Sequence, residues 1–202
     1  MFLPYIPKLI QHAFPQLLWR VENSNSLYLT FDDGPVPEVT PWVLDQLKQR
    51  DIKASFFCIG DNVQRHPDIF QALRDQGHQV GNHTQHHVSG WATDDEQYLD
   101  EVMACQQWVA SKLFRPPYGR IGLSQINLLK PDYSIVMWNV LSGDYDPNLS
   151  AEQCFQNATR YARPGSIIVF HDSIKAFPRL KEALPRALDY WQQKGFQFDV
   201  LT

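Results

Sequence analysis

The sequence predicts one α/β domain in which parallel strands lie inside a layer of helices. Short apolar runs alternate with helical patterns along most of the chain, and this alternation is typical of βα units with a parallel sheet. The 202 residues are 44% hydrophobic, which is enough for a sizeable core. No repeat, low-complexity block or Pro/Gly/Ser-rich linker divides the chain. We therefore expect a single domain of residues 1–202, built in the manner of a (β/α) barrel.

The expected strands are short apolar runs. They are LYLTF (27–31), ASFFCIG (54–60), HQVGN (78–82), YSIVMW (133–138), GSIIVF (165–170) and FQFDVL (196–201). The first expected helix begins near Thr40, which can cap it, with Pro41 at its first position. The next helix, HPDIFQALRDQG, ends at Gly77. Further helices are expected at 94–112, 150–161 and 179–193. In the 94–112 segment, apolar residues recur every three or four positions, as on one face of a helix.

Residues 1–25 form an N-terminal extension that we expect to pack on the domain. The stretch MFLPYIPKLIQHAFPQLLW is apolar but broken by three prolines, without a charged region before it or a small-residue cleavage site, so a secretory signal is not expected. No run approaches the ~18 apolar residues of a membrane span. We expect a cytoplasmic protein with no transmembrane segment. The alternative for the extension is an anchor on a membrane surface.

Charge and cysteine content argue against a nucleic-acid-binding protein and against a disulfide-stabilised protein. The net charge of −4 indicates no basic surface for nucleic acid. It is compatible with a neutral polymer, such as a polysaccharide, as the substrate. The three cysteines, Cys58, Cys105 and Cys154, are far apart and odd in number, unlike a disulfide framework. We expect buried free thiols, as in a reducing compartment.

Polar residues with catalytic chemistry follow several of the expected strands. Asp32 and Asp33 follow the first strand, His83 follows the third, Asp144 comes after YSIVMW, and His171 directly follows GSIIVF. In barrels of parallel strands, the residues after the strands gather on one face, where active sites lie. We therefore expect these side chains to share a site.

The stretch GNHTQHH is a candidate metal-binding motif. His83 and His87 are four residues apart, so on a helical turn their rings share one face, and two imidazoles at this spacing suit a transition metal. His86 is a rival at i+3, and surface histidines on a loop are the alternative. Asp33 is available as a third ligand, and three ligands with an open position are typical of catalytic zinc. Its neighbour Asp32 can then stay free as a base.

The stretch FRPPYG (114–119) predicts a stiff loop. Its two prolines fix φ and remove two backbone donors. The loop holds Arg115, a permanent cation that can position a carboxylate, and Tyr118. A structural turn with a surface arginine is the alternative.

Five ordered stretches resemble the motifs of the polysaccharide deacetylases of carbohydrate esterase family 4, the NodB homology domain. They are TFDDGP (30–35), His83-Thr84-Gln85-His86-His87 for His-(Ser/Thr)-x-x-His, Arg115 to Gly119 for Arg-Pro-Pro-Tyr-Gly, Asp144-Tyr145 for Asp-Trp, and Val169-Phe170-His171 for Leu-x-His. The resemblance covers about residues 26–200. It implies a distorted or incomplete (β/α) barrel of the NodB-homology type.

The resemblance also implies a function. The chain is expected to remove N-acetyl groups from an N-acetylglucosamine-containing glycan, of the chitooligosaccharide or peptidoglycan type, and to release acetate. One divalent metal ion, Zn²⁺ first with Co²⁺ or Ni²⁺ as alternatives, would be held by Asp33, His83 and His87, which favours His87 over His86. An O-acetyl esterase acting on xylan, a small-molecule amidase and an inactive carbohydrate-binding relative remain as alternatives.

By the same resemblance, Asp32 is the base and Arg115 holds it ionised, while His171 protonates the leaving amine and Asp144 orients His171. A backbone N–H near Tyr118 would stabilise the oxyanion. Tyr118, Tyr145 and Val169 are expected to contact the substrate. Tyr145 stands where the family usually has Trp, and Val169 where it usually has Leu. The catalytic chemistry is therefore expected to be retained, while the fit to the substrate differs.

Overall fold

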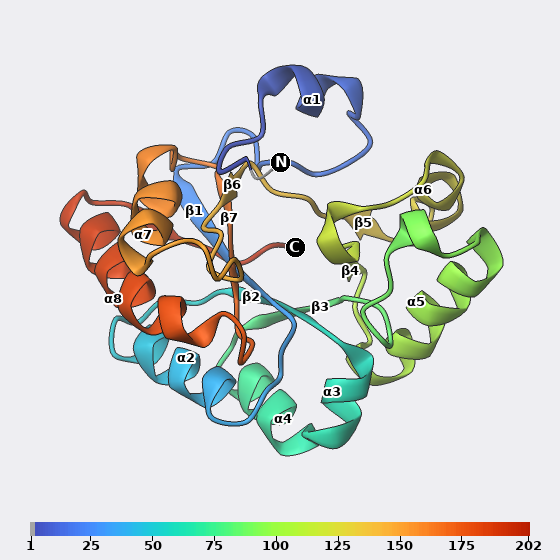
Figure 1. Ribbon diagram of the computed structural model, residues 1–202, viewed down its shortest axis with the longest axis horizontal. Coiled ribbons are helices and arrows are strands. Elements are labelled where there is room, and N and C mark those ends of the chain that lie inside the picture. The colour runs from blue at the N-terminus through green and yellow to red at the C-terminus, as the bar shows by residue number, and fades with distance from the viewer. Residues whose placement is uncertain (1–2) are drawn as a thin grey trace.

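In the computed structural model, which describes residues 3–202, eight parallel strands form one curled sheet (Figure 1). The strands are β1 (Ser26–Asp32), β2 (Ser55–Cys58), β3 (Gln79–Asn82), β4 (Leu113–Phe114), β5 (Ser134–Ile135), β6 (Val140–Leu141), β7 (Ile167–His171) and β8 (Gln197–Phe198). Their spatial order is β5-β4-β3-β2-β1-β7-β6, with β8 paired to β1. Because β5 and β6 do not pair with each other, the barrel is open, which confirms the predicted incomplete (β/α) barrel.

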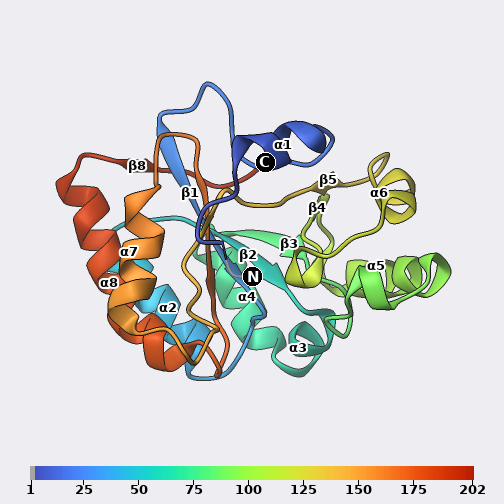
Figure 2. The same ribbon diagram turned by 45° about the horizontal axis from the view of Figure 1, so that its top comes forward.

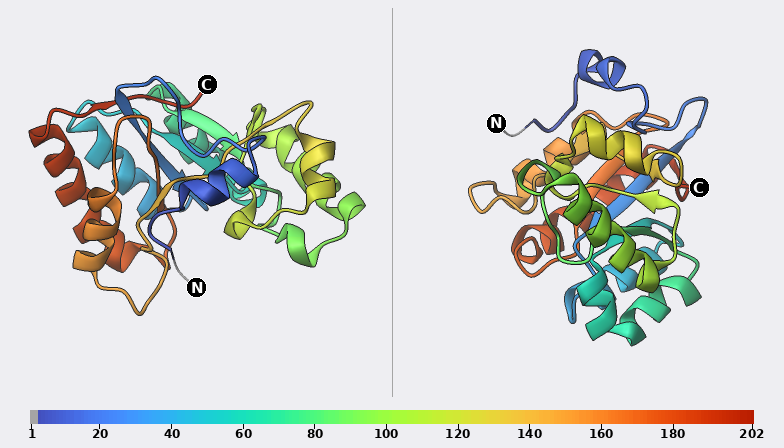
Figure 3. Two further views of the ribbon diagram at one scale, coloured as in Figure 1. Left: turned by 90° about the horizontal axis from the view of Figure 1, so that it is seen from above. Right: turned by 90° about the vertical axis from the view of Figure 1, so that its right-hand side faces the viewer.

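Helices lie around the outside of the sheet, except α1, which lies over its opening, as Figures 1 and 3 show from different sides. They are α1 (Lys8–Ala13), α2 (Val39–Lys48), α3 (Gly60–Arg65), α4 (Pro67–Asp75), α5 (Asp95–Val109), α6 (Leu123–Leu129), α7 (Ala151–Arg160) and α8 (Phe177–Gln193). Two short 3-10 turns complete the described elements, η1 (Gly90–Ala92) and η2 (Pro117–Gly119). Ser150 begins α7 with a capping box, in which its hydroxyl accepts a hydrogen bond from the Gln153 N–H.

Strand β1 shows how the sheet separates the core from the site. Leu29 and Phe31 are fully buried among the residues of the surrounding helices. Since successive side chains on a strand point to opposite faces, Tyr28, Thr30 and Asp32 point into the barrel. Tyr28 packs there with apolar residues that fill one end, and Asp32 ends the strand at the other end.

The N-terminal segment lies across the opening of the barrel (Figure 2). Leu18 pairs with Val136, next to β5, and Tyr5 pairs with Val140 on β6. Helix α1 in between buries none of its residues. Residues 1 and 2 of the expected extension lie outside the described residues. None of the described helices is long and apolar enough to cross a membrane.

The structure divides one expected strand and adds elements that the pattern did not predict. YSIVMW is not a single strand, because the chain leaves the sheet after Ile135, pairs with Leu18, and returns as β6. Helices α1, α3 and α6 and strands β4 and β6 were not expected. All three cysteines are buried and free, as predicted.

Candidate active site

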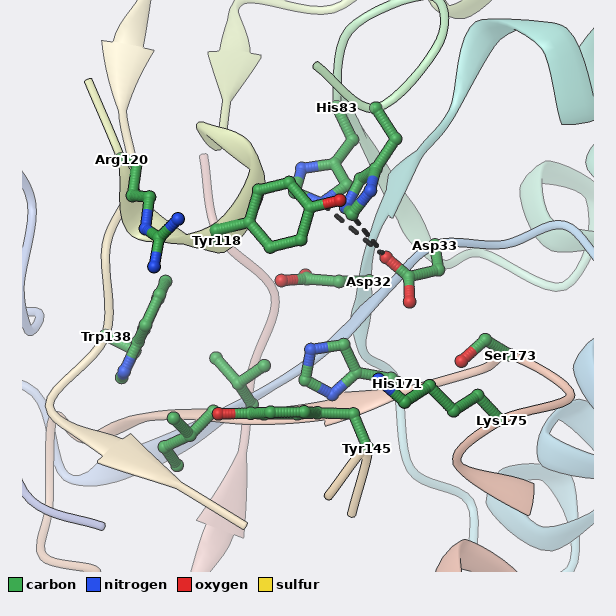
Figure 4. Close-up of a pocket in the computed structure, with 13 residues that line it drawn as sticks. Asp32, Asp33, His83, Tyr118, Arg120, Trp138, Tyr145, His171, Ser173 and Lys175 are labelled. Atoms are coloured by element: carbon green, nitrogen blue, oxygen red, sulfur yellow. Dashed lines mark ion pairs between the residues drawn. The ribbon is translucent and has the colours of Figure 1, made fainter. Parts of the chain in front are cut away.

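A pocket of about 540 Å³ opens at the carboxyl ends of the strands (Figure 4). Its lining brings together residues from β1, β6, β7 and the segments that follow β1, β3, β4, β5, β6 and β7. They are Asp32, Asp33, His83, His87, Tyr118, Arg120, Trp138, Leu141, Tyr145, Val169, His171, Ser173 and Lys175. All ten residues that the sequence predicts for the site either line this pocket or, in the case of Arg115 and Asp144, bond directly to a residue that does.

Asp33, His83 and His87 form a cluster whose ligand atoms all lie within 4.8 Å of one another. The Nε2 atoms of His87 and His83 lie 3.3 and 3.8 Å from Asp33 Oδ1. Asp33 reaches them because its φ of 85° turns the chain sharply after β1, a conformation that aspartate tolerates better than most residues. The adjacent carboxylates of Asp32 and Asp33 therefore point in different directions (Figure 4).

The two histidines converge through a loop and not through a helix, so the helical-turn explanation of their spacing was wrong. Residues 83–87 have no helical structure, and both Thr84 and His87 have left-handed φ values, of 63° and 58°. The loop rests on the start of α3, where the N–H groups of Gly60 and Asp61 donate to the carbonyls of Thr84 and Gln85, each at 3.0 Å. These contacts fix the backbone from which the two rings project.

His86, the rival ligand, lies outside the cluster. Its Nδ1 is 2.8 Å from Glu101 Oε1, and its backbone N–H donates to Glu101 Oε2 at 2.8 Å. Its side chain is 62% exposed. Glu101 thus holds His86 on the surface.

The protonation states of the cluster suit a metal ion. His83 Nδ1 donates to the Arg115 carbonyl at 2.7 Å, which leaves the Nε2 lone pair facing Asp33. Burial lowers the pKa of His83 to about 4, so the ring is neutral, as a ligand must be. Burial raises the pKa of Asp33, but the hydrogen bond from His87 and the nearby imidazoles outweigh it and hold the pKa well below its usual range. Two imidazoles and one carboxylate are a donor set for a first-row divalent metal.

Asp32 has a different partner. Its Oδ1 accepts a hydrogen bond from Arg115 Nη1 at 2.7 Å, and the same nitrogen donates to the Thr30 hydroxyl at 2.7 Å. Arg115 is fully buried, and its guanidinium lies 4.1 Å from the ring of Phe57. Arg115 is therefore an internal ion-pair partner of Asp32 and not a surface arginine.

His171 lies next to Asp32 in the register of β1 and β7. Its Nδ1 is 2.8 Å from Asp144 Oδ1, and its backbone N–H donates to Asp144 Oδ2 at 2.8 Å. Burial lowers the pKa of His171, but the Asp144 carboxylate outweighs it and raises the pKa to about 9. The ring of Tyr145 packs edge-on against His171 at 4.9 Å between ring centres.

Tyr118 forms another wall of the pocket. Its ring centre is 4.6 Å from that of His87. Its φ of 60° directs the backbone away from a regular turn, and within residues 3–202 its main-chain N–H finds no acceptor. Val169 lines the pocket and is almost completely buried.

Comparison with known proteins places this site in a family. The family model for polysaccharide deacetylase matches residues 20–130. A peptidoglycan-N-acetylglucosamine deacetylase of Bacillus cereus is 33% identical, covering 91% of this chain and 90% of the relative. The chain belongs to the polysaccharide deacetylase family.

Two further comparisons agree with this assignment. A chitooligosaccharide deacetylase of Bradyrhizobium sp. is 32% identical over 90% of this chain and 91% of the relative. The crystal structure of the Bc1960 peptidoglycan N-acetylglucosamine deacetylase superposes with a TM-score of 0.89 at 29% identity, covering 98% of this chain and 95% of that one. The predicted family and fold are therefore confirmed for this polysaccharide deacetylase domain.

This deacetylase domain also contains site residues that the sequence analysis missed. Asp172 is fully buried, and its carboxylate accepts hydrogen bonds from the Gly34 N–H at 3.1 Å and the Thr40 hydroxyl at 2.6 Å. It thereby holds the turn that presents Asp33. Asp172 directly follows His171, the last residue of β7, and this position was a signal that could have revealed it. The pocket-lining Arg120 and Lys175 carried no comparable signal, because only the folded loops bring them there.

Proposed function

We propose that this chain is a metal-dependent hydrolase that removes N-acetyl groups from an N-acetylglucosamine-containing glycan, of the chitooligosaccharide or peptidoglycan type, and releases acetate. The observation that carries the proposal is the different environment of two adjacent aspartates. Asp33 faces two imidazoles, whereas Asp32 faces a buried guanidinium. The relatives named above act on such glycans according to their names.

Asp33, His83 and His87 would hold the metal ion, with Zn²⁺ as the first choice and Co²⁺ or Ni²⁺ as alternatives. When bound, such an ion polarises a carbonyl and makes water a better nucleophile near neutral pH. The hydrogen bond from His83 Nδ1 to the Arg115 carbonyl would keep this ring in the orientation and tautomer that a ligand needs.

Asp32 and His171 would divide the proton transfers. Arg115 Nη1 lies 2.7 Å from Asp32 Oδ1 and holds this carboxylate in place, so Asp32 can accept the proton of the water that adds to the acetamide carbon. His171, with its pKa raised to about 9 by Asp144 despite burial, carries a proton at neutral pH and can donate it to the leaving nitrogen. The C–N bond breaks, and the products are acetate and a free amine on the sugar.

The walls of the pocket would orient the acetamide. The main-chain N–H of Tyr118, which has no acceptor within residues 3–202, is the candidate donor to the developing oxyanion, and one such donor contributes roughly 3 kcal/mol. Tyr145 and Val169 would contact the acetyl group or the sugar ring. Tyr145 in place of the family's usual Trp presents a smaller ring with a hydroxyl.

The test is acetate release by the metal-reconstituted protein on N-acetylchitooligosaccharides, peptidoglycan glycan strands and O-acetylated xylan. We expect acetate from the two N-acetylated glycans. Acetate from xylan alone would make the chain an esterase, and glycan binding without any acetate would make it an inactive relative. Either result contradicts the proposal. The cytoplasmic location expected from the sequence stays a prediction.

A further inference from the structure

An exposed tryptophan stands beside the pocket without a role in the proposed reaction. Trp91 lies in η1 with 70% of its surface exposed. It does not line the pocket itself. Its indole N–H donates to the Ile121 carbonyl at 3.1 Å, so one edge of the ring is fixed while much of its apolar surface faces solvent. An exposed aromatic ring that is held at one edge offers a flat apolar face on which a ligand ring can pack.

The backbone around Trp91 is built to hold it there. The Gly90 N–H donates to the Arg120 carbonyl at 3.1 Å, and the buried amide of Gln125 donates to the carbonyls of Gly90 at 2.9 Å and Thr93 at 3.1 Å. A Cβ on Gly90 would lie 2.8 Å from the Arg120 carbonyl oxygen, so only glycine allows this close approach. The Trp91 turn and the Arg120 loop therefore form one rigid unit.

Arg120 connects Trp91 with the pocket. Its guanidinium carbon lies 5.5 Å from the ring centre of Trp91 and 5.9 Å from that of Tyr118. Tyr118 and Arg120 line the pocket, with Arg120 on the side opposite Lys175 (Figure 4). The pocket wall thus continues outward in one row, from Tyr118 beside the metal cluster through Arg120 to Trp91.

Arg120 is also a charge without an acidic partner in the described chain. The carboxylates of the site are already engaged, Asp32 with Arg115 and Asp144 with His171. Arg120 is exposed and lines the pocket, so its guanidinium is open to an anionic group on the ligand. A planar guanidinium matches a carboxylate with two parallel hydrogen bonds.

We propose that Trp91 and Arg120 form a subsite for the sugar adjoining the one that reacts, with Trp91 stacking on the sugar ring and Arg120 binding a carboxylate that this sugar carries. The inference rests on the proposed deacetylase function and narrows its substrate to N-acetylated glycans with acidic sugars. Neutral chitooligosaccharides would use only the stacking contact.

Three tetrasaccharides of equal length test the subsite. The first is neutral tetra-N-acetylchitotetraose, the second is a peptide-free peptidoglycan tetrasaccharide with a lactyl carboxylate on alternate sugars, and the third is the second after reduction of its carboxyl groups to alcohols. For each, kcat and KM are measured with zinc-loaded protein, and binding is measured by calorimetry on the Asp32→Asn variant background.

We expect the wild type to prefer the acidic tetrasaccharide over its carboxyl-reduced form by about tenfold or more, the effect of one hydrogen-bonded charge pair. Arg120→Gln should abolish this preference, and Lys175→Gln, which removes the same charge from the opposite wall, should retain it. Trp91→Ala should raise KM for all three substrates. Trp108→Ala, at another exposed tryptophan on α5, should change none of these values.

The inference is overturned if the wild type does not distinguish the acidic from the reduced tetrasaccharide, or if Arg120→Gln keeps the preference. An unchanged KM in Trp91→Ala overturns the stacking contact. Deacetylation of the tetrasaccharides without any acidic preference refutes only this subsite, whereas acetate release from none of them refutes the proposed function. If no acetate is released, the binding affinities from calorimetry for the acidic and the carboxyl-reduced tetrasaccharide still decide whether the subsite exists.

Discussion

Replacing Arg115 by methionine should strongly destabilise the fold, because this side chain compensates a buried charge. Arg115 is fully buried and Asp32 is only 4% exposed. Arg115→Met removes the 2.7 Å ion pair with Asp32 and the hydrogen bonds to the carbonyls of Val136 and Met137 at 3.3 and 3.0 Å. Breaking a buried pair by removing one partner costs about 3–5 kcal/mol, and unsatisfied carbonyls add to this.

Thermal unfolding monitored by circular dichroism measures the effect on the metal-free protein. At about 2–4 °C per kcal/mol for a chain of this size, the melting temperature should fall by roughly 10 °C. Arg120→Met is the matched control at an exposed arginine and should stay within about 0.5 kcal/mol of the wild type.

The double variant Arg115→Met/Asp32→Leu separates charge from packing. Removing both charges leaves no uncompensated carboxylate, so the double variant should lose clearly less stability than the sum of the single variants. A loss below about 1 kcal/mol for Arg115→Met, or strict additivity in the double variant, would refute the role of Arg115 as the counter-charge of Asp32.

Two further predictions concern the histidines. His87→Ala should lose bound zinc after dialysis while His86→Ala retains it, as measured by elemental analysis, and equal metal content in both would contradict the cluster. Asp144→Asn should lower the pKa of His171 from about 9, so the alkaline limb of the kcat/KM profile should move to lower pH. The ion pair of His171 with Asp144 stabilises the wild-type fold fully below pH 6.5, the ordinary pKa of histidine. This stability advantage over Asp144→Asn should disappear as the pH rises through about 9. An unchanged kcat/KM profile would show that Asp144 does not act on His171.

The parallel sheet could be predicted from the sequence because its main strands are long or strongly apolar. The alternation of strands and helices and the uninterrupted run of β1 were sufficient for this. Strands β4, β5 and β6 contain two residues each, which is too short for a detectable period. The opening between β5 and β6, and the N-terminal segment that crosses it, depend on contacts between distant parts of the chain.

The site could be predicted only in part, because its geometry depends on unusual backbone conformations. The sequence placed Asp32 and Asp33 directly after a strand, but the φ of 85° at Asp33 that separates the two carboxylates became visible only in the structure. The convergence of His83 and His87 was expected from helical spacing and in fact comes from the left-handed conformation at Thr84 and His87. Hydrogen bonds to the start of α3, which had not been predicted, hold that loop.

The most direct test of the central claim compares two adjacent substitutions, Asp32→Asn and Asp33→Asn. Each removes one negative charge at neighbouring positions, so a difference between them reports on position and not on total charge. Metal content and acetate release are measured on both variants and the wild type. Our account predicts that Asp32→Asn binds zinc like the wild type and loses nearly all turnover, whereas Asp33→Asn loses the metal. Loss of metal from Asp32→Asn, or near-normal turnover by it, would contradict the division between a metal ligand and a base.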